Sequence, residues 1–125
     1  MSSPITPIDI GIFRASAVAA SGTLRVTCFG EGDASALGAV DQLLREVHAS
    51  AVEARVSEVV FDLRTVSFMN SSCFTKFVGW VTRVRELPED ARYRICLQSN
   101  QELLWQRRSL HALKHFATDL ITIEG

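Results

Sequence analysis

The chain has 125 residues, which fits one domain with a core of ordinary size. Its composition is 47% hydrophobic and 22% charged, and its formal net charge is -1. This profile is typical of a globular protein and excludes a disordered tail. The near-neutral balance gives no field that would attract nucleic acid or an anionic membrane.

The three cysteines, Cys28, Cys73 and Cys96, lie far apart and inside apolar stretches. They form no C-x-x-C pair, so the sequence predicts no zinc site and no redox motif, but free buried thiols in a reducing compartment. No apolar run near the N-terminus is long enough for a signal peptide or a membrane span. We therefore expect a soluble, cytoplasmic protein.

The first elements are two strands joined by a turn. Residues 1–8 contain two prolines and predict a loose lead-in. Ser21-Gly22 is a turn signal, and residues 23–29 then alternate between apolar and polar side chains, which predicts a half-buried strand in a hairpin. The strand before the turn is carried by Ile10, Ile12 and Val18.

A first helix is predicted over residues 34–54. The segment Gly30-Glu31-Gly32-Asp33 breaks the preceding strand, and Asp33 is a good helix N-cap. Apolar residues then recur at helical spacing, at Leu37, Val40, Leu44, Val47 and Ala51.

Residues 59–63 form a short run rich in β-branched and aromatic residues, which predicts a central strand covered on both faces. A brief connection over residues 64–69 leads into Asn70-Ser71-Ser72. Apolar residues at helical spacing follow as far as Leu87, where Pro88 ends the helix.

The last part of the chain predicts a strand over residues 93–97, a helix capped by Asn100, and a strand over residues 120–123. Strands that alternate with helices predict an α/β fold, in which a mixed, mostly parallel sheet of about five strands packs against the helices. We expect one domain over residues 1–125.

Two segments resemble the STAS domain of bacterial anti-sigma factor antagonists. Residues 59–72 are similar to the family's buried strand ending in Asp-Leu, a short connection, and Asp-Ser-Ser-Gly opening a helix. Residues 30–33 are similar to the Gly-Glu-x-Asp that precedes the family's first helix. The sequence departs from this family pattern at two places: Asn70 replaces the Asp, and Cys73-Phe74-Thr75 replaces Gly-Leu-Gly.

The resemblance implies a regulatory binding protein with no catalytic residues and no cofactor. By position, Ser71 would be phosphorylated by a partner kinase and anti-sigma factor of the histidine-kinase-like ATPase type, and a serine/threonine phosphatase would reverse the reaction. The unmodified form would bind that kinase and release its client. A binding scaffold without phosphorylation, in a signalling or transporter complex, is the alternative that Asn70 and Cys73 favour. Formation of a homodimer stays open.

Physical chemistry points to the same hydroxyl. A helix begins with unpaired N–H groups and a partial positive charge, and Asn70, Ser71 and Ser72 all suit such an end. Ser72 is the less favoured acceptor, and a capping role alone is the simplest alternative for the three residues. We expect the partner surface to include these residues and also Thr75, Lys76, Gly79, Arg64 and Asp33.

Other chemistry has little support. His111 and His115 share a helix face but lack the further ligands of a metal site, and we expect them in solvent, with His48 at a boundary. An enzyme would need a cluster of titratable groups, for which only Asp62, Glu31 and Asp33 stand in plausible positions.

Overall fold

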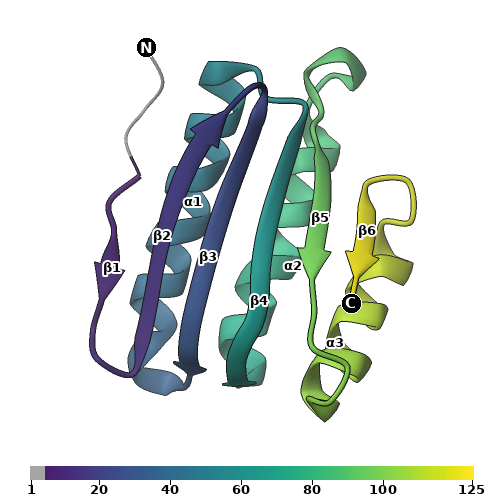
Figure 1. Ribbon diagram of the computed structural model, residues 1–125. Coiled ribbons are helices and arrows are strands. Elements are labelled where there is room, and N and C mark those ends of the chain that lie inside the picture. The colour runs from purple at the N-terminus through teal and green to yellow at the C-terminus, as the bar shows by residue number, and fades with distance from the viewer. Residues whose placement is uncertain (1–4) are drawn as a thin grey trace.

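The computed structural model describes residues 5–125, which form one sheet with helices packed against it (Figure 1). The strands are β1 (Ile8–Asp9), β2 (Phe13–Ala20), β3 (Thr23–Gly32), β4 (Glu58–Met69), β5 (Arg94–Gln98) and β6 (Ile121–Glu124). The helices are α1 (Leu37–Ala54), α2 (Ser71–Glu86) and α3 (Leu104–Phe116), with short 3-10 turns η1 (Ala34–Ala36) and η2 (Glu89–Ala91).

The strands lie in the sheet in the order of the sequence, from β1 to β6. The pairs β1–β2 and β2–β3 are antiparallel, and β3–β4, β4–β5 and β5–β6 are parallel. The predicted mixed and mostly parallel sheet is therefore confirmed, with six strands in place of about five. Of the predicted lead-in, residues 1–4 lie outside the described residues. Its last residue is not loose, since Ile8 pairs with Ala15 in the sheet.

All three α-helices lie on one face of this sheet (Figure 1). The reason is the strand order: each parallel connection moves one strand further in the same direction, and right-handed connections then place every helix on the same side. The prediction that residues 59–63 are buried on both sides of the strand is confirmed, since all five are at most 9% exposed, but helices cover only one of the two faces. Helices cover one face of β4, and the other belongs to what we call the open face, which carries Arg25, Val60, Asp62, Cys96 and Gln98.

The core lies between the sheet and the three helices. Alternate strand residues point into it, among them Val26 of β3, Phe61 of β4 and Leu97 of β5, which stand side by side across three strands and are 0% exposed. The rings of Phe61, Phe77 and Trp80 meet edge to face, with centroids 5.1 to 6.3 Å apart, and join α2 to the sheet. The three cysteines are free and buried, as predicted.

The hairpin between β2 and β3 is confirmed. Ser21 and Gly22 both have positive φ, 51° and 81°, which gives the turn that twisted antiparallel strands favour. The predicted end of β3 is wrong, because the strand continues through Gly30, with φ of 99°, as far as Gly32. A glycine is needed at position 30, since a Cβ there would collide with the carbonyl oxygen of Ile12.

Strand β4 is more than twice as long as predicted, because residues 64–69 extend it rather than connect it to the helix. The register between β3 and β4 shifts twice in this stretch, between Thr27 and Phe29 and between Gly30 and Glu31 of β3. Each shift inserts an extra residue in β4, as in a β-bulge. The buried side chains therefore recur in steps of three, at Leu63, Val66 and Met69.

Side chains of α3 continue the pairing of β4 beyond the end of β5. The amide nitrogen of Gln106 donates to the carbonyl oxygens of Leu63 (2.6 Å) and Val66 (3.1 Å), and the indole of Trp105 donates to Val66 (2.9 Å).

The prediction that Asn100 caps this helix is wrong. Helix α3 begins at Leu104, and the Asn100 side chain instead accepts from the Glu102 N–H.

Candidate functional site

The site is built around the first turn of α2. Asn70 is the N-cap, with extended backbone (φ -76°, ψ 167°), and its side-chain oxygen accepts from the N–H of Cys73 at 2.8 Å. The backbone oxygen of Asn70 accepts from Phe74 at 3.0 Å. Asn70 thus orders the start of the helix, and its neutral amide leaves the first turn without an acidic residue.

The two segments that resemble the STAS domain meet in space at this turn. The N–H of Asn70 donates to the carbonyl oxygen of Gly32 at 2.8 Å, and the thiol of Cys73 donates to that of Asp33 at 3.4 Å. A Cβ on Gly32 would lie 3.2 Å from the Met69 side chain, so a glycine allows this close approach. Asp33 caps η1 rather than the long helix, because its carboxylate accepts from the Ser35 N–H at 2.9 Å.

Ser71 and Ser72 occupy the first two positions of α2, and both are exposed. Among residues 5–125, none makes a hydrogen bond to the Ser71 hydroxyl or accepts one from the N–H of Ser71 or Ser72. The carbonyl of Ser71 accepts from the Thr75 hydroxyl at 2.8 Å. The turn therefore offers a hydroxyl to solvent beside two unpaired donors and the positive end of the helix.

Thr75, Lys76 and Gly79 continue from Ser71 along the outer side of α2. Together with α1 they line a hollow of about 220 Å³, which we call the α1/α2 groove. Its lining residues are Asp41, Leu44, Arg45, Thr75, Lys76, Gly79, Trp80 and Arg83. Sequence reasoning named Thr75, Lys76 and Gly79 of α2 but missed Arg83 of the same helix. It missed Asp41 and Arg45 because nothing in the sequence shows that α1 packs beside α2.

Phe68 is another residue that sequence reasoning missed. It stands at the end of β4, two residues before Asn70, and is 44% exposed. Its position opposite Glu31 of β3 belongs to the irregular part of β4, where the side-chain direction follows the bulges rather than simple alternation. Single exposed apolar side chains are common on protein surfaces, so Phe68 is a candidate contact only through its position in the chain, two residues before the cap of α2.

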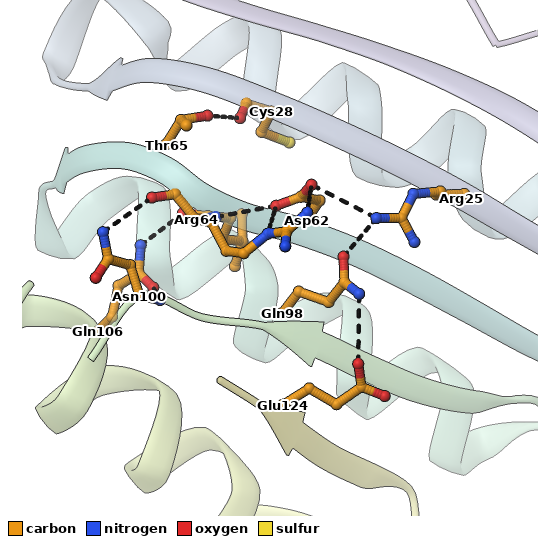
Figure 2. A network of polar contacts seen from close by, with 10 residues as sticks. Arg25, Cys28, Asp62, Arg64, Thr65, Gln98, Asn100, Gln106 and Glu124 are labelled. Atoms are coloured by element: carbon orange, nitrogen blue, oxygen red, sulfur yellow. Dashed lines mark hydrogen bonds and ion pairs between the residues drawn. The ribbon is translucent and has the colours of Figure 1, made fainter. Parts of the chain in front are cut away.

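Arg64 does not join the other predicted site residues. It lies on β4, exposed, and its guanidinium forms two bonds to the Asp62 carboxylate, at 3.0 and 2.8 Å (Figure 2). Arg25 lies 3.5 Å from the same carboxylate, and it donates to Gln98 at 2.6 Å. Arg64 is therefore held in a polar network on the open face, away from the α1/α2 groove.

The Asp62 network also bears on the enzyme alternative. The hydrogen bonds from Arg64 hold the pKa of the Asp62 carboxyl below its usual value, so it stays ionised and is poorly suited to proton transfer near neutral pH. Glu31 pairs with Phe68 near the end of β4, and Asp33 contacts Cys73 of α2. Both therefore lie further along the sheet than Asp62, which pairs with Thr27. The structure thus separates the three carboxylates that an enzyme would need together.

The histidines are placed as expected, with His111 and His115 exposed and His48 half-buried. Residues 5–125 contain no group of three or more His, Cys, Asp or Glu side chains placed to hold a metal ion. Within the same part of the chain, no helix has the length and apolar character needed to cross a membrane.

Comparison with protein family models and with curated proteins finds no match for this sequence. Solved structures do match. An anti-sigma factor antagonist from Mycobacterium paratuberculosis superposes with a TM-score of 0.65 at 16% identity, over 99% of this chain and 90% of that one. The anti-sigma factor antagonist SpoIIAA, in its unphosphorylated form, superposes with a TM-score of 0.58 at 21% identity, over 89% of this chain and 88% of that one. The chain has the fold of the anti-sigma factor antagonists, that of a STAS domain.

Proposed function

We propose that this protein is a partner-switching regulator that acts like an anti-sigma factor antagonist, with Ser71 as the switch. It binds a regulatory kinase of the histidine-kinase-like ATPase type through the start of α2, and phosphorylation of Ser71 ends the binding. The observation that carries the proposal is the exposed Ser71 hydroxyl on the first turn of α2, in a chain with the fold of known antagonists.

The local geometry supports a phosphate at this position. The N–H groups of Ser71 and Ser72 are free to donate to added oxygens, and the helix dipole favours negative charge by about 0.3–1 kcal/mol in exposed settings. No acidic side chain stands in the first turn to repel a phosphate. The modification adds a charge of about -1.5 to -2, enough to change what docks there.

The binding surface combines polar and apolar parts. Asn70, Ser71, Ser72 and Thr75 provide the polar centre, and the 44% exposed ring of Phe68 lies two residues from the cap. Such a pattern, an apolar anchor beside hydrogen-bonding groups, suits a protein partner better than a small molecule. The serine/threonine phosphatase that would reverse the switch needs access to the same exposed turn.

The test is phosphorylation of the purified chain with ATP and the kinase of this ATPase type encoded nearest its gene. We expect one phosphate on Ser71, located by mass spectrometry. Ser71→Ala should lose it and keep kinase binding, Ser71→Asp should bind more weakly, and Ser72→Ala, the matched control, should still be modified. Failure of Ser71 to gain phosphate with the cognate kinase would falsify the switch.

A binding scaffold without phosphorylation is the second candidate. It is favoured by Asn70 and Cys73, which replace the Asp and Gly of the family pattern and which the fold uses structurally, as a cap and as a buried thiol. For a scaffold, Ser71→Ala should behave like the wild type in every assay, while Thr75→Glu or Lys76→Glu should disrupt the complex. Protein purified from its own cells and never found phosphorylated would favour this candidate.

A further inference from the structure

The α1/α2 groove carries a surplus of positive charge. Arg45, Lys76 and Arg83 line it together with one acidic residue, Asp41. Asp41 is shared, since its carboxylate lies 3.0 Å from the Arg45 guanidinium and 3.7 Å from the Lys76 ammonium. These are exposed ion pairs, which are weak in water and easily exchanged for others.

Arg83 differs from the other two cations. It is exposed, and no carboxylate of residues 5–125 lies within 4 Å of its guanidinium. Burial lowers the pKa of the half-buried His48, and the positive charge of Arg83 lowers it further. The formal net charge of the chain is -1, but the groove has three cationic side chains around one shared carboxylate and is therefore locally positive.

The shape of the groove leaves room for side chains from outside. Its floor is closed by Leu44 and Trp80, which are 4% and 2% exposed. Its wall on α2 is opened by Gly79, because a Cβ at that position would meet no atom within 4 Å. The φ of Gly79 is not in the positive range, so the backbone does not require glycine there. The missing side chain creates space in the groove and has no conformational role.

We propose that the α1/α2 groove binds an acidic segment of the partner protein, with Asp or Glu side chains on successive turns placed against Arg83, Lys76 and Arg45. The inference rests on the proposed function and specifies the chemistry of the partner. Ser71, Thr75, Gly79 and Arg83 follow one another at intervals of four along α2, and helix geometry places the ends of this row about 18 Å apart. A partner helix of about twelve residues would span both the groove and the switch.

This arrangement gives the switch a physical mechanism. Thr75, at the nearer end of the groove, lies four residues beyond Ser71 and on the same side of α2, a rise of about 6 Å along the helix. That is within the Debye length of about 8 Å at physiological ionic strength, so a phosphate on Ser71 acts on whatever occupies the nearer end of the groove. The nearer end of an acidic segment, beside Thr75 and Lys76, would be repelled by the new negative charge. Its far end at Arg83 lies about 18 Å from Ser71 and would be screened. Phosphorylation would therefore weaken the binding of the partner without any change of fold.

The experiment is an NMR titration of the full-length, ¹⁵N-labelled chain with a helical peptide of about twelve residues that carries glutamates one turn apart. A peptide with glutamine at each of those positions is the matched control. We expect amide shifts centred on Thr75, Lys76 and Gly79, and binding by the glutamate peptide that weakens with salt. The glutamine peptide should bind at least about tenfold more weakly, since it lacks every ion pair.

Two variants test the groove directly. Arg83→Glu replaces an attraction with a repulsion and should weaken the glutamate peptide by about tenfold. Gly79→Phe should fill the groove and block the peptide, while Gly79→Ala, which keeps most of the space, should bind it. Arg107→Glu, on the exposed side of α3, is the charge control and should bind like the wild type. Melting temperatures of all variants exclude unfolding as the cause.

The proposal fails if the glutamine peptide binds equally well, if the shifts centre on α3, or if Arg83→Glu has no effect. It also fails if inorganic phosphate or ATP shifts the same amides and the glutamate peptide does not, since the groove would then be an anion site for small molecules. These outcomes do not depend on the kinase. Groove binding without Ser71 phosphorylation would overturn the switch alone, and phosphorylation without groove binding would overturn the groove alone.

Discussion

The side chain of Gln106 offers the sharpest test of how the fold holds the long strand β4. Gln106 is 1% exposed, and its amide nitrogen donates to two carbonyl oxygens of β4 while its oxygen accepts from the Asn100 N–H at 2.7 Å. Replacement by alanine removes all three bonds at once. The carbonyl oxygen of Val66 still accepts from the Trp105 indole at 2.9 Å. The groups left without a partner are therefore the carbonyl oxygen of Leu63 and the N–H of Asn100.

The size of the effect follows from these losses. A buried polar group left without its partner costs about 1–3 kcal/mol, and a typical hydrogen bond such as that to Asn100 contributes about 0.5–1.5 kcal/mol. We expect Gln106→Ala to lower the free energy of unfolding by about 2–4 kcal/mol, which shifts the urea midpoint down by about 1–2 M. Equilibrium urea unfolding, followed by tryptophan fluorescence, measures this change.

Two comparisons decide the explanation. Gln106→Glu keeps an acceptor for Asn100 but loses the donor to Leu63 and places a carboxylate against two carbonyl oxygens, so it should be at least as destabilising as the alanine. Gln42→Ala, at an exposed glutamine of α1, should change stability by less than about 0.5 kcal/mol. A Gln106→Ala protein within about 0.5 kcal/mol of the wild type would show that these bonds do not hold β4 in place.

Three further predictions concern stability. The Trp80 indole donates to the Tyr93 hydroxyl (2.8 Å), which can then donate to Nδ1 of a neutral His48 (2.7 Å). Burial and Arg83 lower the His48 pKa, so the folded chain binds this proton less well than the unfolded chain. Stability should therefore fall as the pH drops below about 6.5, and the urea midpoint of His48→Gln should fall less over that range. Asn70→Ala should lose about 1 kcal/mol by removing the cap of α2, whereas Asn70→Asp should stay close to the wild type; equal urea midpoints for all three proteins would count against the cap. Gly30→Ala should lose more than about 1 kcal/mol in thermal unfolding, because alanine neither suits φ of 99° nor fits beside the Ile12 carbonyl, and an unchanged melting temperature would contradict this.

The sequence predicted those parts of the fold in which one period persists. The alternation in residues 23–29 and the helical spacing after Asn70 correspond to β3 and α2. The second half of β4 was not predicted as a strand. Two bulges change the spacing of its buried residues from two to three, a pattern that matches neither a regular strand nor a helix. The pairing partners of that segment, Trp105 and Gln106, come from α3, about forty residues away, and no local pattern reveals them.

The site could be predicted only in part for a similar reason. Capping preferences place Asn70 and Ser71 at a helix start from local sequence alone, and the structure agrees. The α1/α2 groove depends on which helices pack together, so Asp41 and Arg45 of α1 could not be predicted from the sequence. Arg83 was missed although it lies on α2, one turn beyond Gly79. Arg64 was misplaced relative to the other site residues, because its direction depends on the bulged strand and on its bonds to Asp62.

The number of bulges in β4 determines where along the sheet α2 begins. Up to Asp62, the strand is paired on both sides and its register is fixed by β3 and β5. Beyond it, each extra residue changes how far the chain advances before Asn70 meets Gly32. Deleting one residue between Arg64 and Phe68 would retract the helix start by up to about 3.3 Å and turn its first hydroxyl toward a different side. Insertions and deletions in this short stretch could therefore move the Ser71 hydroxyl across the surface while the rest of the domain stays unchanged.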